Sequence, residues 1–197
     1  MRTPGFGLRC SRPIPRPPSV SHSAQCAAYQ GQLEAVRLLL DHRADPDPDP
    51  LLYDTPLLAA SASCAAPVVS LLLDCRVRVM VRDQVGQTPL HRAASSGSAE
   101  VATRLLDHGA AVGARDLQNE TPLLCAAANG HVQVASLLLV RGAAAGERNH
   151  KGQNARDRAS EAACEELVAM IDEREGGGHI PSPKMLDFSL RRQDELN

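Results

Sequence analysis

Residues 82–97 read Arg-Asp-Gln-Val-Gly-Gln-Thr-Pro-Leu-His-Arg-Ala-Ala-Ser-Ser-Gly, and this stretch decides the fold. Its triplet Thr-Pro-Leu, which starts at Thr88, also occurs at Thr55 and at Thr121, so the spacing is 33 residues both times. A fixed period of that length is typical of a chain built as a stack of similar units rather than around one core. Stacked units present a long surface and need no reactive pocket.

The quoted stretch predicts a turn followed by a short helix. Residues 83–86 have the composition of a turn, with Gly86 supplying a positive φ. Thr88 is placed to cap the helix with its hydroxyl, and Pro89 suits the first helical position because its missing N–H would be unpaired there. Gly97 ends the helix. The narrow apolar face of this helix consists of Leu90, Ala93 and Ala94.

A second helix is expected to follow from about Ala99 and to end at Gly109 in the left-handed conformation. Neither helix is long enough to be stable alone in water, so each must bury its apolar stripe against a neighbouring unit. The same order recurs from Thr121 to Ala143. The inward residues expected on the two second helices are Val101, Leu105 and Leu106, and then Val132, Val134, Leu137 and Leu138.

The pattern Gly-x-Thr-Pro-Leu-His-x-Ala-Ala-x-x-Gly from Gly86 to Gly97 resembles the ankyrin repeat. The resemblance implies an all-α fold, an ankyrin-repeat solenoid of stacked helix-turn-helix units joined by hairpin-like turns. It covers residues 22–173, with units near 22–49, 50–82, 83–115, 116–148 and 149–173. The outer copies depart from the pattern: Tyr53, Cys64 and Arg76 stand where glycines belong, and the first and fifth copies lack the triplet.

Composition narrows the functional classes. Aromatic residues make up 2% of the chain and the net charge is −2. These values disfavour a ligand pocket walled by rings and a surface for nucleic acid. No apolar run approaches membrane-spanning length, and no secretory signal is expected. We expect no membrane partner, no nucleic-acid partner, no cofactor and no metal.

The six cysteines show no Cys-x-x-Cys spacing. Partly buried, reduced thiols are therefore expected, including Cys26 and Cys125 at the same phase of the repeat, in a cytoplasmic and/or nuclear protein. The alternative is a redox-sensing thiol, for which Cys75 beside Arg76 is the candidate. No phosphate loop, metal-binding helix or nucleophile elbow is present, so we expect that the chain is not an enzyme.

The two ends of the chain differ from the repeats. Residues 1–21 carry five prolines, four arginines and no acid, and are expected to be disordered. Within them, Arg12–Pro18 matches the Arg-x-x-Pro-x-x-Pro pattern of ligands for SH3-type domains, the alternative being an unselected tail. Residues 174–197 are expected to form a flexible tail that begins with three glycines. Its apolar residues, expected to anchor a partner or to fold back on the last unit, are Met185, Leu186, Phe188 and Leu190.

The resemblance implies that partners contact the tips of the turns and the exposed side of the first helices. An apolar strip at the tips (Leu51, Leu52, Val85 and Leu117) would suit an interaction surface, unless these residues pack against their own helices. The positions implied on this sequence are Leu51, Leu52, Asp54, Ala62, Ser63, Gln84, Val85, Gln87, Ser95, Ser96, Leu117, Gln118, Glu120, Ala128, Asn129, His150, Lys151, Gln153 and Glu161.

Two charged features accompany these positions. Arg82, Arg115 and Arg148 recur every 33 residues and are expected to form a basic ridge for an acidic peptide. The alternative is that basic residues are simply frequent at this position in such repeats, with Asp83 and Asp116 next to two of them. Residues 45–50 alternate aspartate and proline, which indicates a solvated turn or, as an alternative, a calcium site.

The sequence thus favours a monomeric, non-catalytic protein-interaction module or adaptor. The alternative is a substrate receptor or regulatory subunit of a multi-protein enzyme, such as a ubiquitin ligase or a kinase.

Overall fold

The computed structural model describes residues 20–47 and 55–176. The predictions for Arg12–Pro18, for the C-terminal tail beyond Gly176 and for the binding residues Leu51, Leu52 and Asp54 lie outside these residues. The described residues form ten helices and no strand. The helices are α1 (Val20–Tyr29), α2 (Leu33–Asp41), α3 (Pro56–Ala62), α4 (Ala66–Asp74), α5 (Pro89–Ser96), α6 (Ala99–Asp107), α7 (Pro122–Ala128), α8 (Val132–Val140), α9 (Ala155–Glu161) and α10 (Glu165–Gly176).

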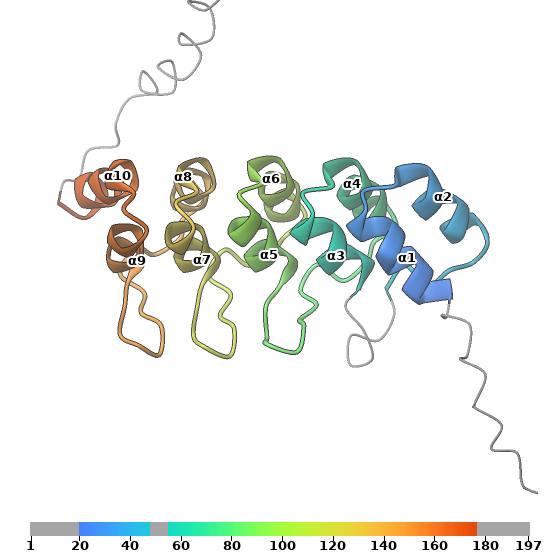
Figure 1. Ribbon diagram of the computed structural model, residues 1–197, viewed down its shortest axis with the longest axis horizontal. Coiled ribbons are helices and arrows are strands. Elements are labelled where there is room, and N and C mark those ends of the chain that lie inside the picture. Colours follow the sequence, from blue (N-terminus) through green and yellow to red (C-terminus); the bar gives the residue numbers. More distant parts are fainter. Residues whose placement is uncertain (1–19, 48–54, 177–197) are drawn as a thin grey trace, which may run out of the picture.

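The helices stand in two parallel rows (Figure 1). The first helices of the units, α1, α3, α5, α7 and α9, form one row, and the second helices form the other. The main contacts run within each pair and between neighbouring pairs. Hairpin-shaped connections project from the row of first helices (Figure 1). The all-α solenoid implied by the sequence is confirmed.

The Thr-Pro-Leu triplets begin the first helices as expected. Thr55 and Thr121 are N-cap residues whose hydroxyls accept hydrogen bonds from the N–H groups of Leu58 and Leu124, at 3.3 and 3.4 Å. Thr88 is the N-cap residue of α5. In all three units the proline occupies the start of the helix, where its lack of an N–H has no cost.

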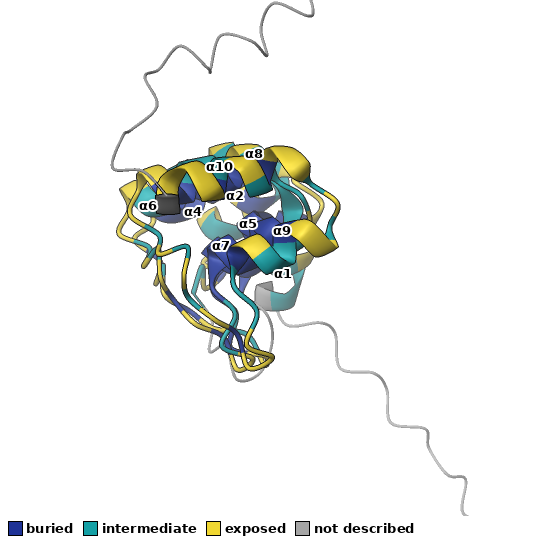
Figure 2. Cartoon of the chain, turned by 90° about the vertical axis from the view of Figure 1, so that its left-hand side faces the viewer, coloured by how far each residue is buried: buried dark blue, intermediate teal, exposed yellow. Residues whose placement is uncertain are grey.

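The core lies between the two rows of helices, as the view along the stack from the α9–α10 end shows (Figure 2). It consists mainly of Leu, Val and Ala, with Ile171 and Cys125. Small residues at the contacts between first helices let the units approach closely: Ala60, Ala93, Ala94, Ala126 and Ala127 are completely buried. Their neighbours in the second helices include Val101, Leu105, Val134 and Leu138, also completely buried.

Helix ends follow the expected backbone geometry with small differences in position. Arg76 and Cys64 adopt the left-handed conformation, with φ of 56° and 61°, although neither is glycine. Helix α1 begins at Val20, two residues before the expected start of the repeats, because no proline or glycine interrupts the sequence between Pro18 and Gly31. Helix α10 continues past residue 173 to Gly176, where a run of glycines begins.

Candidate functional site

Each described hairpin is organised by the side chain of its first residue. The Oδ1 atom of Asp83 accepts hydrogen bonds from the N–H groups of Val85 and Gln87, at 2.9 and 2.8 Å. The same pair of bonds recurs at Asp116 and again at Asn149, with distances between 2.8 and 3.0 Å. One acceptor therefore holds two backbone donors in each turn, which fixes the position of the residues at the tip.

The arginines of the predicted basic ridge are exposed and lie at the base of these hairpins. Each guanidinium bonds an acceptor four residues later in its own turn. Arg82 also donates to the carbonyl oxygen of Arg115 at 2.6 Å, and Arg115 pairs with Glu147. Arg148 lies 3.7 Å from Asp157. Because the charges are engaged in this way, the geometry favours a structural role of these arginines in the hairpins over contact with a partner.

The described tips carry exposed apolar side chains. Val85 is 43% exposed and Leu117 is 63% exposed, and the N–H of Leu117 donates to the carbonyl of Val85 at 3.1 Å. Gln84 and Gln118 beside them are also exposed. Neighbouring tips are thus joined through the backbone while their side chains face solvent, so Val85 and Leu117 do not pack into their own helices.

A hollow of about 340 Å³ lies in the angle between the first helices and the hairpins of units three to five. We call it the groove hollow. The structure brings together eight of the positions expected from the sequence there: Gln87, Ser95, Gln118, Glu120, Ala128, Asn129, His150 and Lys151. Four further lining residues were not expected: Asp116, Cys125, Asn149 and Arg158. Ser96 is not among the residues that line the hollow, and its hydroxyl donates to the carbonyl of Ala62 at 2.8 Å.

The groove hollow has a charged pair at its floor. The Oε1 atom of Glu120 accepts a hydrogen bond from Nδ2 of Asn149 at 2.9 Å, and it lies 3.7 Å from Nη2 of Arg158. The side chains of Glu120 and Arg158 are 16% and 24% exposed. Among the described residues, Oε2 of Glu120 and Nε of Arg158 have no hydrogen-bond partner. Both atoms are themselves buried, so they stay without a partner unless the two side chains reorient toward the hollow.

Periodicity would have revealed the residues that were missed. Asp116 and Asn149 follow Asp83 at the repeat spacing, and Arg158 follows Cys125 at the same spacing.

Comparison with family models supports the repeat architecture. The model for ankyrin repeats in three copies matches residues 24–116, and the model for a single ankyrin repeat matches residues 118–150. The matches span more than half of the 197 residues. The chain belongs to the ankyrin repeat family. No curated protein matches it in a sequence comparison.

Ankyrin repeats generally mediate protein–protein interaction and are typically non-catalytic. In the ankyrin units described here, Cys125 at the groove hollow is buried, and burial together with the nearby Glu120 raises the pKa of its thiol to about 12. Its sulfur is therefore a neutral thiol near pH 7 rather than a nucleophilic thiolate. In contrast to the expectation of partial burial, Cys26, Cys64 and Cys75 are exposed, although Cys26 lies at the same phase of the repeat as the buried Cys125.

The described part of the ankyrin chain contains no helix both long and apolar enough to cross a membrane. Within the same residues, no group of three or more His, Cys, Asp or Glu side chains could hold a metal ion. In the acidic run at 45–50, the described Asp47 accepts hydrogen bonds from the backbone N–H of Arg78 at 3.1 Å and from its Nε at 2.6 Å. Asp47 thus joins the first connection to the next one.

Proposed function

We propose that this chain is a non-catalytic adaptor whose protein partner binds along the angle between the first helices and the hairpins, centred on the groove hollow. The observation that supports this most directly is the pair Glu120 and Arg158. Both are mostly buried, and each keeps one polar atom without a partner among the described residues. Buried polar atoms are normally paired, so Glu120 and Arg158 gain two hydrogen bonds if they reorient toward a ligand that supplies the missing groups.

The chemistry of the hollow suits an extended segment of a partner protein. Such a segment offers both N–H donors and C=O acceptors, which match Oε2 of Glu120 and Nε of Arg158. The walls at Ser95 and Ala128 are small and leave room for larger side chains of the partner. The exposed Leu117 adds apolar contact area beyond the hollow.

Affinity purification from cells followed by mass spectrometry tests the proposal. The variant Ala128→Arg places a long cationic side chain in the hollow, whereas Gln133→Arg adds the same charge at an exposed position of α8. We expect the partners of the natural chain to be lost with Ala128→Arg and kept with Gln133→Arg, while both variants retain their melting temperature. Equal recovery with the two variants would place the partner elsewhere.

The same experiment separates the adaptor from the alternative role. Cullin and elongin components among the recovered proteins would indicate a ubiquitin-ligase receptor, and a recurrent kinase would indicate a regulatory subunit. Unrelated signalling or cytoskeletal proteins would indicate an adaptor. The exposed thiols of Cys26, Cys64 and Cys75 agree with our further proposal that the protein works in the cytoplasm or the nucleus.

The hairpin tips are tested separately. Leu117→Glu, at a side chain that is 63% exposed, should leave the melting temperature nearly unchanged and weaken binding of the recovered partner. Gln133→Glu introduces the same charge at an exposed polar position of α8, away from the hairpin tips, and serves as the control. A large drop in melting temperature for Leu117→Glu would show that this residue belongs to the core.

A further inference from the structure

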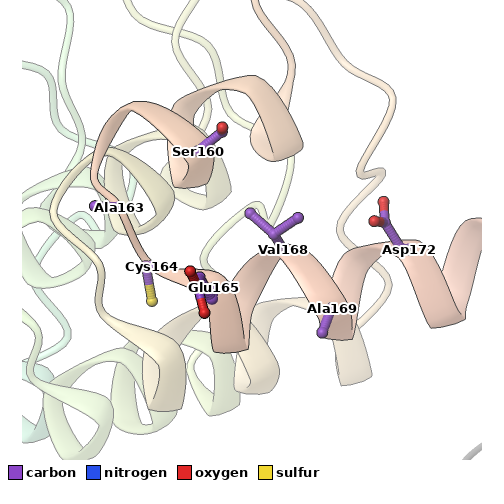
Figure 3. Close-up of a pocket in the computed structure, with 7 residues that line it drawn as sticks. All are labelled: Ser160, Ala163, Cys164, Glu165, Val168, Ala169 and Asp172. Atoms are coloured by element: carbon purple, nitrogen blue, oxygen red, sulfur yellow. The ribbon is translucent and has the colours of Figure 1, made fainter.

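The outer face of the last unit has a second depression, of about 470 Å³, which we call the end hollow. Figure 3 shows Ser160 on α9 above Val168 and Asp172 on α10, with the α9–α10 turn beside them. The lining residues are Ser160, Ala163, Cys164, Glu165, Val168, Ala169 and Asp172.

The repeat identifies this face as one on which a further unit would stack. The residues 33 positions before Val168 and Asp172 are Ala135 and Leu139, and both are buried. In the last unit, Val168 is half-buried and Asp172 is exposed. No described element covers them. The end hollow is therefore a stacking face that still carries apolar surface.

This face of the last unit carries charged residues at two positions where the preceding unit has apolar ones, but it keeps some apolar residues. Asp172 replaces a leucine and pairs with Arg156 at 2.5 Å, and Glu165 stands where the preceding unit has Val132. Val168 and Ala169 remain apolar between the two acids. An apolar floor with an acidic rim favours an occupant that is apolar in its middle and basic beside it.

We propose that the segment Ile180–Arg192 of this same chain docks in the end hollow and covers the last unit. Helix α10 ends at Gly176, one helical turn beyond Asp172, so the chain leaves the helix next to the hollow. The three residues 177–179 span at most about 10 Å when extended, and two of them are glycines, which permit a reversal of direction. Ile180 and its successors are thus within reach of Val168.

The chemistry of the segment matches that of the hollow. It contains Met185, Leu186, Phe188 and Leu190, which offer apolar side chains to Val168 and Ala169. Its cations, Lys184, Arg191 and Arg192, flank this apolar group and complement Glu165, whereas Asp172 is already paired with Arg156. A tethered segment has an effective concentration on the order of millimolar, which favours it over a second copy or a free partner at cellular concentrations.

Alkylation of Cys164 in the full chain measures whether the hollow is covered. Cys164 lines the end hollow and is half-buried, and its sulfur lies 4.0 Å from the carbonyl oxygen of Gly130, so a docked segment that covers this end of the stack should slow its reaction with N-ethylmaleimide. Peptide mass spectrometry follows each cysteine separately. Cys64, which is exposed and distant in the stack, reports the intrinsic reaction, and the buried Cys125 reports loss of folding.

The variant Leu186→Asp with Phe188→Asp should raise the rate of Cys164 alkylation about tenfold, which corresponds to about 1.4 kcal/mol of docking free energy. Leu196→Asp, outside the proposed segment, should leave the rate unchanged. The rates at Cys64 and Cys125 should not change in either variant. Equal Cys164 rates in the natural chain and the double variant would overturn the proposal.

Charge reversal supplies an independent check on the occupant. Arg191→Glu with Arg192→Glu should accelerate Cys164 alkylation, and the further change Glu165→Lys should restore protection. If protection of Cys164 instead grows with protein concentration and sedimentation shows a dimer, the occupant is a second copy and the proposal is wrong.

Discussion

His91 shows how a single residue of the repeat joins two units. It is fully buried, and its Nδ1 atom accepts a hydrogen bond from the N–H of Thr88 at 3.1 Å. This bond requires an unprotonated Nδ1, so the proton resides on Nε2, which donates to the carbonyl of Glu120 in the next unit at 3.0 Å. Burial lowers the pKa of His91 below its ordinary value near 6.5, against the opposing effect of the Glu120 carbonyl.

The lowered pKa of His91 gives a pH dependence with a definite sign. Between the folded-state pKa and 6.5 the unfolded chain binds more protons than the folded one. The contribution of His91 to stability is therefore fully present above pH 6.5 and is lost as the pH falls through the folded-state pKa. Thermal unfolding should show a larger loss between pH 7.5 and 5 for the natural chain than for His91→Gln. An equal loss in both would contradict this assignment.

Substitutions at Gly97 and Gly109 separate the energetic cost of a left-handed backbone from the cost of steric crowding. Both have positive φ, at 79° and 85°. A methyl group on Gly97 would lie 2.6 Å from Nδ1 of His131, whereas one on Gly109 would meet no atom within 4 Å. The ring of His131 is held by a bond between its Nε2 and the carbonyl of Ser95, at 3.0 Å, so it cannot move without loss.

We therefore expect Gly109→Ala to cost about 1 kcal/mol of unfolding free energy, from backbone conformation alone. Gly97→Ala should cost about 1–3 kcal/mol more, because the neighbouring ring must shift. Urea denaturation measures both. If the two substitutions cost the same, the close contact with His131 is not present in solution.

At the scale of elements, each hairpin depends on the acceptor at its first residue. Asp116→Ala removes the oxygen that binds the N–H groups of Gln118 and Glu120, and we expect a loss of about 1–3 kcal/mol. Asp116→Asn keeps this oxygen, as the natural Asn149 does in the next hairpin, and should change stability by less than about 0.5 kcal/mol. Chemical denaturation compares the two. Similar losses would mean that the charge of Asp116, rather than its geometry, holds the hairpin.

The elements themselves were largely predictable. Local chemistry determines where the helices begin and end, so the sequence predicts these positions. Examples are the threonine caps, the prolines at the helix start and the helix ends at Gly97 and Gly109. Even Arg76 adopts the left-handed conformation that the repeat requires, although it costs about 1 kcal/mol relative to glycine. Leu139 was missed as a core residue, and Leu137 is only half-buried, because periodicity alone did not fix which side of α8 faces the neighbouring units.

The candidate site was only partly predictable for a physical reason. The hairpin tips and the exposed faces of the first helices follow from the repeat, so the sequence predicts those positions as contacts for a partner. The pairing of Glu120 with Arg158 and Asn149 joins different units, and such contacts depend on how the units are rotated relative to each other. The engagement of the basic ridge in its own hairpins is likewise visible only once side-chain directions are known.

At the scale of the whole molecule, stability comes from contact between neighbouring units. The principal contacts of a helix do not extend beyond the adjacent pairs in the described stack. Free energy is therefore distributed along the molecule rather than concentrated in one core. This arrangement aligns the first helices and their hairpins along one side of the stack (Figure 1). The groove hollow lies between these elements in units three to five.

Hydrogen–deuterium exchange of Leu105→Ala, resolved by helix, tests this account most directly. Leu105 is completely buried in α6, and its truncation should cost about 2–5 kcal/mol. We predict that protection falls most in α5 and α6, less in α3, α4, α7 and α8, and least in α9 and α10. A uniform loss of protection across all these helices would contradict the account, because it would show a single cooperative core instead of units stabilised by their neighbours.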